Sequence, residues 1–135
     1  WNRRAPRSPR AEFVPDSPPD PLELAPLFEL DEGAFRARFR RTPLWRAHRR
    51  GLLRNAAIVI GNQRSEAGRR ALARGLHDEE PLVRAAAAWA LGQIGGEPSR
   101  AVLRDRAVVE GDAAVAQEIR AALAAAIVPR SPTAT

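Results

Sequence analysis

A pair of helical patterns that returns about every 30 residues constrains the fold of this chain more than any other feature of its sequence. Apolar residues recur at three- and four-residue steps. Equivalent positions on the second helix of each pair are Leu53, Val83 and Val115, which lie 30 and 32 residues apart. Helix pairs that repeat at this length are typical of an α-solenoid, in which each pair buries its apolar face against the next. No segment shows the alternation of a strand, so we expect an all-α fold, a short α-solenoid of helical-hairpin repeats.

Capping residues and prolines mark where the helices of these pairs begin and end. A long helix should open at Thr42-Pro43 and stop at Gly61-Asn62, and Gly51 is its weakest point. The last helix should cover Ala113–Ile127. Other helices should start at Asp31, with Phe35 and Phe39 facing inward, and at Ser65, Pro81 and Ser99. The inward face of the long helix should hold Leu44, Trp45, His48, Leu52, Leu53, Ala56 and Ile60.

Proline divides the chain into three parts. Five prolines between residues 15 and 26 predict an irregular stretch, because proline lacks a donor and restricts the residue before it. We therefore expect a connector over residues 1–29, a repeat domain over residues 30–128 and a flexible tail over residues 129–135. No apolar run reaches the length of a membrane span, and no secretory signal is visible, so we expect a cytoplasmic protein.

The net charge of +6 is distributed unevenly along the chain. Residues Ala11–Glu32 hold seven acids and no base, whereas Gly33–Arg54, here called the basic segment, holds eight arginines and no acid. A basic block of this density indicates either a polyanionic partner or a solvated face. All 22 basic residues are arginine, which weakens the first interpretation, because arginine clusters then arise without a nucleic-acid role.

Helical spacing predicts how part of the basic segment is displayed. In a continuous helix, Arg46, Arg50 and Arg54 form a ridge about 12 Å long, opposite the apolar face, and Arg49 lies beside it. Planar guanidinium groups bind phosphate oxygens bidentately and stack on unpaired bases. The ridge is therefore a candidate RNA contact, with an exposed solvated face as the alternative.

Residues Leu30–Asn62 have the sequence LDEGAFRARFRRTPLWRAHRRGLLRNAAIVIGN, and PLVRAAAAWALGQIGG follows later. Together with the opening Trp1-Asn2-Arg3, these segments resemble the C-terminal region of epoxyqueuosine reductase. The resemblance implies HEAT-like repeats that help to hold tRNA. Arg41 stands where relatives usually carry a small residue, and Ala86 stands where many carry histidine.

The same resemblance implies what this chain should lack. The family reduces epoxyqueuosine in tRNA with cobalamin and two [4Fe–4S] clusters, and these sites would lie upstream of Trp1. The chain has no cysteine to ligate a cluster and no initiating methionine, so we expect it to be part of a longer polypeptide. We expect no catalytic or metal-binding residue within it.

The expected partner is therefore tRNA carrying epoxyqueuosine in its anticodon stem-loop, alongside an N-terminal catalytic domain in cis, with the chain itself a monomer. The alternative is a short HEAT-repeat adaptor that binds protein and has no enzymatic role. The predicted tRNA-binding residues are Arg46, Arg49, Arg50, Arg54, Asn55, Arg36, Arg38, Arg40 and Arg41.

Other polar and aromatic residues each have two interpretations. Asn55 positions RNA or a loop of a neighbouring domain, or it makes an inter-helix or loop-capping hydrogen bond. His48, Trp45 and Trp89 belong to packed faces, with RNA contact or base stacking as the alternative. The acidic run Asp78–Glu80 precedes Pro81, so capping of a helix N-terminus and compensation of the helix dipole explain it better than a cation site.

Overall fold

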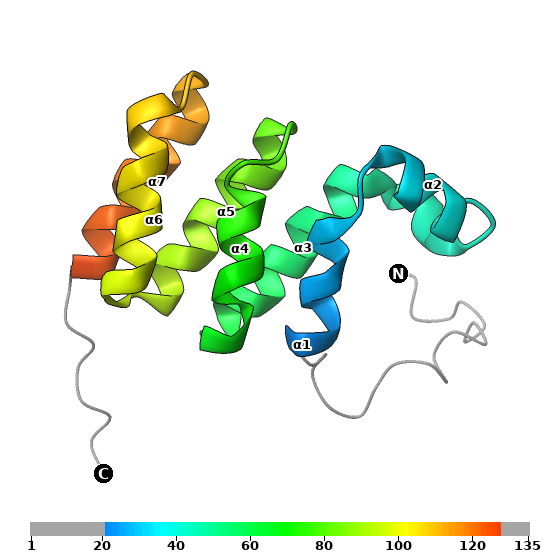
Figure 1. The fold of residues 1–135 in the computed structure, drawn as a ribbon, viewed down its shortest axis with the longest axis horizontal. Coiled ribbons are helices and arrows are strands. Elements are labelled where there is room, and N and C mark those ends of the chain that lie inside the picture. Colours follow the sequence, from blue (N-terminus) through cyan, green and yellow to red (C-terminus); the bar gives the residue numbers. More distant parts are fainter. Residues whose placement is uncertain (1–20, 128–135) are drawn as a thin grey trace, which may run out of the picture.

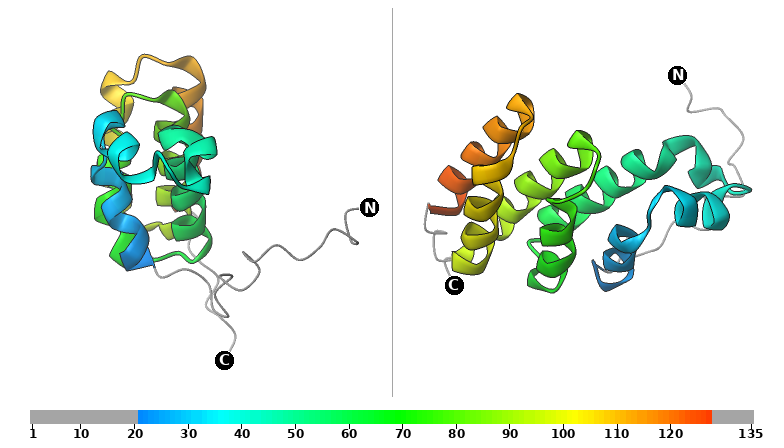
Figure 2. Two further views of the ribbon diagram at one scale, coloured as in Figure 1. Left: turned by 90° about the vertical axis from the view of Figure 1, so that its right-hand side faces the viewer. Right: turned by 45° about the horizontal axis from the view of Figure 1, so that its top comes forward.

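The computed structural model describes residues 21–127, which form two layers of helices stacked along one axis (Figure 1). Figure 2 shows the two layers side by side when the stack is viewed from one end. No strand occurs in residues 21–127, so the predicted all-α solenoid is confirmed. The first layer contains α1 (Pro21–Leu24), the 3-10 helix η3 (Ala25–Glu29), η5 (Glu66–Gly68), α4 (Arg69–Gly75) and α6 (Gly96–Val109). The second layer contains α3 (His48–Asn62), α5 (Pro81–Ile94) and α7 (Ala113–Ile127).

A small aromatic cluster closes one end of the stack, where α2 (Glu32–Phe39) and the 3-10 helix η4 (Pro43–Ala47) lie. The side chain of Asp31 caps α2 by accepting a hydrogen bond from the Ala34 amide at 2.7 Å, as its position predicts. Phe35 and Phe39 are buried with ring centroids 5.1 Å apart, and Trp45 stacks on Phe35 at 5.8 Å. This cluster orients the first half of the basic segment.

The long helix expected from Thr42 is interrupted. The 3-10 helix η4 ends at Ala47, and α3 begins at His48, whose φ of 56° lies in the left-handed region. The Thr42 hydroxyl donates to the Phe39 carbonyl at 2.8 Å and caps nothing downstream. Leu44 and His48 were predicted to face inward but are exposed, because the bend turns this segment away from the face that α3 buries. The weak point lies three residues before Gly51, which remains helical.

Glycine and alanine allow the helices of the second layer to approach closely. A Cβ added to Gly61 on α3 would lie 2.9 Å from the Cα of Ala90, and one added to Gly92 on α5 would lie 2.9 Å from the Cα of Ala122. Such distances leave no room for a side chain at either glycine. The alanine-rich composition therefore serves close helix packing, around large buried side chains that include Leu53, Ile60, Leu91 and Ile119.

Two helix starts differ from the prediction. Residues 21–29 were expected in the irregular connector, yet Pro21 and Pro26 lie in the first turns of helices, where proline is tolerated. The following Leu27 and Phe28 are buried in the core. Helix α6 begins at Gly96, and Ser99 is fully buried within it, where its hydroxyl accepts from Arg69 Nε at 3.3 Å.

The predicted start of α5 at Pro81 and the predicted bounds of α7 are confirmed. The rest of the expected connector and the expected tail lie outside the described residues. Within residues 21–127, no helix is long and apolar enough to cross a membrane.

Candidate nucleic-acid interface

The arginines of residues 21–127 fall into two groups, according to whether a carboxylate pairs with them. Those with a carboxylate partner are Arg49, Arg69, Arg84, Arg100, Arg104 and Arg106. In the basic segment, the exposed arginines without an ion-pair partner among the described residues are Arg36, Arg38, Arg40, Arg41, Arg50 and Arg54. Five of the six paired arginines therefore lie in the later repeats, and the basic segment holds six of the exposed arginines without an ion pair among the described residues. The others are Arg64, Arg70, Arg74 and Arg120, which are spread over the rest of the solenoid.

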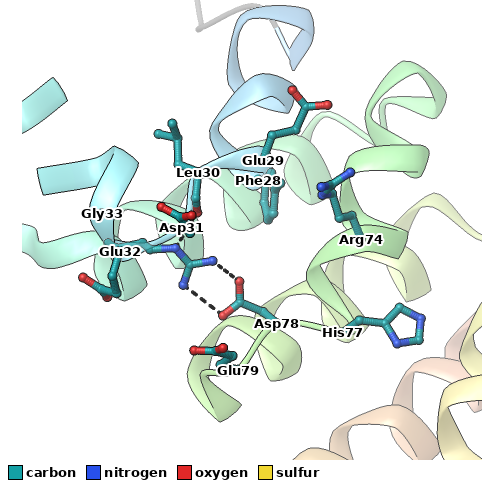
Figure 3. A pocket seen from close by; sticks show the side chains of 11 residues that line it. Phe28, Glu29, Leu30, Asp31, Glu32, Gly33, Arg74, His77, Asp78 and Glu79 are labelled. Atoms are coloured by element: carbon teal, nitrogen blue, oxygen red, sulfur yellow. Dashed lines mark hydrogen bonds and ion pairs between the residues drawn. The ribbon is translucent and has the colours of Figure 1, made fainter. Parts of the chain in front are cut away.

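Arg49 is the exception within the basic segment, because it is paired and only 8% exposed. Its Nε donates to the Leu30 carbonyl at 2.6 Å, and its two terminal nitrogens donate to the two carboxylate oxygens of Asp78. Figure 3 shows Asp78 among the side chains that line the pocket at this junction. The hydrogen bond to Asp78 raises the pKa of Arg49, and this effect outweighs burial, which lowers it.

The prediction that Arg49 lies exposed beside the ridge is therefore wrong. Its bonds join the segment before α2, the start of α3 and the loop between α4 and α5, which fixes the basic segment against the repeats. A guanidinium whose two terminal nitrogens both donate to one carboxylate is not available to bind phosphate.

Arg50 and Arg54 are exposed and lie one turn apart on α3, as the helical spacing predicts. Arg46 precedes the bend at His48, on η4, so the three residues do not form one helical ridge. The side chain of Arg46 lies outside the described residues. Asn55 is exposed, and its Oδ1 accepts a hydrogen bond from Arg54 at 3.3 Å, so its side chain does not bridge two helices.

The arginines of α2 and its C-terminal turn form a second exposed group. The guanidinium carbon of Arg36 lies 5.9 Å from the ring centroid of Trp45, and that of Arg38 lies 5.0 Å from that of Phe39. These cation–π contacts orient the side chains without neutralising them. Arg38, Arg40 and Arg41 line a shallow hollow of about 460 Å³.

The acidic run before α5 does not provide the expected side-chain cap. Glu80 occupies the N-cap position, but its side chain makes no capping bond. The Asp78 carboxylate binds Arg49 and also accepts from the Glu80 amide at 3.0 Å. Arg84 binds the same loop by donating to the Asp78 carbonyl at 2.7 Å. The run therefore closes the loop and holds Arg49, in place of the predicted side-chain cap.

A second buried ion-pair cluster was not foreseen from the sequence. The Glu110 side chain is fully buried and accepts hydrogen bonds from Arg84, from Arg106 and from the Asp112 amide. Burial raises the pKa of Glu110, but the hydrogen bonds, led by that from Arg84, outweigh it and the net shift is downward. The sequence position of these residues could have indicated the pair. Arg84 lies near the start of one helix and Glu110 in the loop of the next hairpin, and Arg49 and Asp78 occupy the equivalent places one repeat earlier.

The described residues contain no group of three His, Asp or Glu side chains that could hold a metal ion. With no cysteine in the whole sequence, the donor set of this chain does not fit a [4Fe–4S] cluster. The candidate interface thus consists of exposed guanidinium groups, the half-buried Trp45 ring and the exposed Asn55 amide.

The HEAT repeat family matches residues 47–124, so the chain is a HEAT-repeat protein and belongs to that family. Among curated proteins it is similar to the epoxyqueuosine reductases of Xanthomonas campestris and Alicycliphilus denitrificans. The identities are 36% over 96 residues and 37% over 101 residues, covering 70% and 69% of this chain. The chain spans 27% and 28% of the length of these relatives.

Solved structures show the same similarity. A crystal structure of epoxyqueuosine reductase with a tRNA-Tyr epoxyqueuosine-modified tRNA stem loop has a TM-score of 0.69 and 25% identity to this chain. The match covers 76% of this chain and 28% of that chain. The resemblance drawn from the basic segment and the later repeat is therefore confirmed.

Proposed function

We propose that this chain is the tRNA-binding HEAT-repeat part of an epoxyqueuosine reductase and orients tRNA for a redox site outside it. The observation that carries the proposal is the set of exposed, unpaired arginines in the basic segment. A neighbouring structure of the same enzyme type holds a tRNA stem loop, which supports the choice of polyanion. Guanidinium groups left without a carboxylate keep their full charge for phosphate oxygens.

Within this proposal the arginines have two roles, phosphate binding and positioning of the surface. Arg50 and Arg54 bind phosphates from α3, with Asn55 beside them, and Arg36, Arg38, Arg40 and Arg41 extend the contact from α2. Arg46 joins them from η4. Arg49 is a positioning residue, because its pair with Asp78 holds this surface in place. Cobalamin and the two [4Fe–4S] clusters of the parent enzyme belong to a domain beyond these residues.

Salt-dependent RNA binding tests the proposal on the full chain. We expect Arg50→Ala with Arg54→Ala to weaken tRNA binding and to flatten the slope of log K against log salt by about 0.7–0.9 per lost phosphate contact. The matched control is Arg100→Ala with Arg104→Ala, which removes the same charge from two arginines that pair with Glu97. The control should leave the slope unchanged.

If both double variants lost the same tRNA affinity, the binding would reflect net charge alone and not a specific interface. If the parent chain binds tRNA with no salt dependence, the proposed function is wrong. The chain is then better explained as a protein-binding HEAT-repeat adaptor.

A further inference from the structure

A groove of about 410 Å³ lies on the second helix layer, where α5 packs between α3 and α7. Its lining is mostly apolar, from α3 and α5, and includes three polar side chains, of which two come from α3 and one from α7. This combination, and a volume in the range of small-ligand sites, suits a flat molecule with a few polar edges. The lining residues are Arg54, Ile58, Asn62, Leu82, Ala85, Ala86, Trp89 and Glu118.

Trp89 provides the aromatic wall of the groove. It is half-buried, and a Cβ added to Gly61 would lie 2.7 Å from its Cζ3, so the indole rests against the backbone of α3. Gly61 therefore fixes one edge of the ring, while the uncovered part lines the groove. Because the indole is already held in place, it loses little side-chain conformational entropy when a second flat group stacks on it.

Charge is distributed unequally between the two ends of the groove. Arg54 lies at the α3 end, and Arg50 is one turn before it, with neither guanidinium in an ion pair among residues 21–127. Glu118 lies at the α7 end and offers acceptors. A phosphate is therefore favoured on the α3 side, and a group with N–H donors is favoured on the α7 side.

We propose that this groove, the Trp89 groove, holds an unpaired RNA base against the Trp89 indole while Arg54 binds the adjoining phosphate. The inference rests on the proposed function and adds which part of the RNA the repeats recognise. An aromatic wall, an aliphatic floor and a cation at one end match a base joined to its phosphate. An apolar peptide side chain would fill the floor but leave the cation unused.

The test compares two RNAs on the full chain, a hairpin with an unpaired loop and a blunt duplex of the same stem. Trp89→Ala should weaken hairpin binding by about 5- to 150-fold, the range for one stacked base, and should leave duplex binding and the salt slope unchanged. Arg50→Ala with Arg54→Ala should weaken both RNAs. The two RNAs therefore distinguish a loss of base stacking, which affects the hairpin alone, from a loss of phosphate binding, which affects both.

A second variant fills the groove without removing the indole. Ala86→Leu should cause the same selective loss of hairpin binding, because the added side chain occupies the space next to Trp89. Ala107→Leu makes the same change at an exposed position of α6 and should have no effect. Thermal melts report whether each variant is folded, and Ala86→Leu decides the outcome if Trp89→Ala does not fold.

Tryptophan fluorescence gives a direct signal. Hairpin binding should quench emission in the parent chain, and the part of the quenching due to Trp89 should disappear in Trp89→Phe. If the arginine double variant loses affinity while Ala86→Leu keeps the parent preference for the hairpin, the Trp89 groove does not hold a base, although the proposed function stands. If neither variant changes RNA binding, both proposals are wrong.

Discussion

The basic segment and the repeats that follow it, residues 65–127, differ in how often an arginine pairs with a carboxylate. In the repeats, five of the eight arginines pair with a carboxylate among the described residues, and Arg84 and Arg106 converge on buried Glu110. Among the described side chains of the basic segment, Arg49 alone pairs with a carboxylate, and its partner Asp78 lies 29 residues along the chain. The difference teaches that arginine content alone does not show which guanidinium groups are free of a carboxylate, because the fold decides that.

The position of each ion pair in the solenoid explains this division. Both buried pairs join the start of a second-layer helix to the loop of the next hairpin, Arg49 to Asp78 and Arg84 to Glu110. A charge at this junction is desolvated by neighbouring repeats and must be paired. Exposed positions on α2 and α3 carry no such requirement, so their arginines keep their charge without a partner.

The largest effect should follow from removing Asp78. Asp78→Ala leaves the Arg49 guanidinium buried without its carboxylate, so we expect the free energy of unfolding to fall by about 3–5 kcal/mol in denaturant titrations. Glu66→Ala is the control, because Glu66 pairs with Arg69 while 80% exposed and should contribute little. If Asp78→Ala kept its stability and bound RNA more tightly, Arg49 would belong with the interface arginines.

A smaller effect should follow from crowding the helix contacts of the repeats. Gly92→Ala places a methyl group 2.9 Å from the Cα of Ala122, so α5 and α7 must separate, at a cost of about 1–3 kcal/mol. Thermal unfolding measures the loss. Gly111→Ala is matched, since nothing lies within 4 Å of a Cβ there, and it should unfold like the parent chain. Equal stability of the two variants would mean that close backbone approach does not hold the stack together.

The smallest effect concerns pH. The folded-state pKa of Glu110 is lowered, so its contribution is complete above the unfolded pKa of about 4.3 and is lost as the pH falls through the folded value. Glu110→Gln should cost on the order of 1 kcal/mol at pH 7, and stability should then depend less on pH below about 5. Unfolding curves from pH 3 to 7 measure both changes. An unchanged pH profile would show that the Arg84–Glu110–Arg106 cluster is not the titrating element.

Local signals in the sequence located much of the fold. The Asp31 cap, the Pro81 start and the full extent of α7 follow from chemistry within one or two turns. The bend at His48 could not be located, because a positive φ at a histidine needs surrounding structure to hold it, and neither glycine nor proline marks the place. Exposure of Arg50 and Arg54 followed from helical spacing, whereas the burial of Arg49 depended on a loop far along the chain.

By itself, the sequence determined the all-α class, the repeat length and the concentration of positive charge in the basic segment, because hydrophobic periodicity and local composition act over short distances. Only the tertiary structure decided which arginines remain available and where an apolar groove opens beside them. Those outcomes depend on contacts between repeats, as when Asp78 neutralises Arg49 and when Gly61 lets Trp89 rest against α3. The composition of the basic segment therefore sets the amount of positive charge, and the stacking of the hairpins decides which of its arginines stay exposed and unpaired.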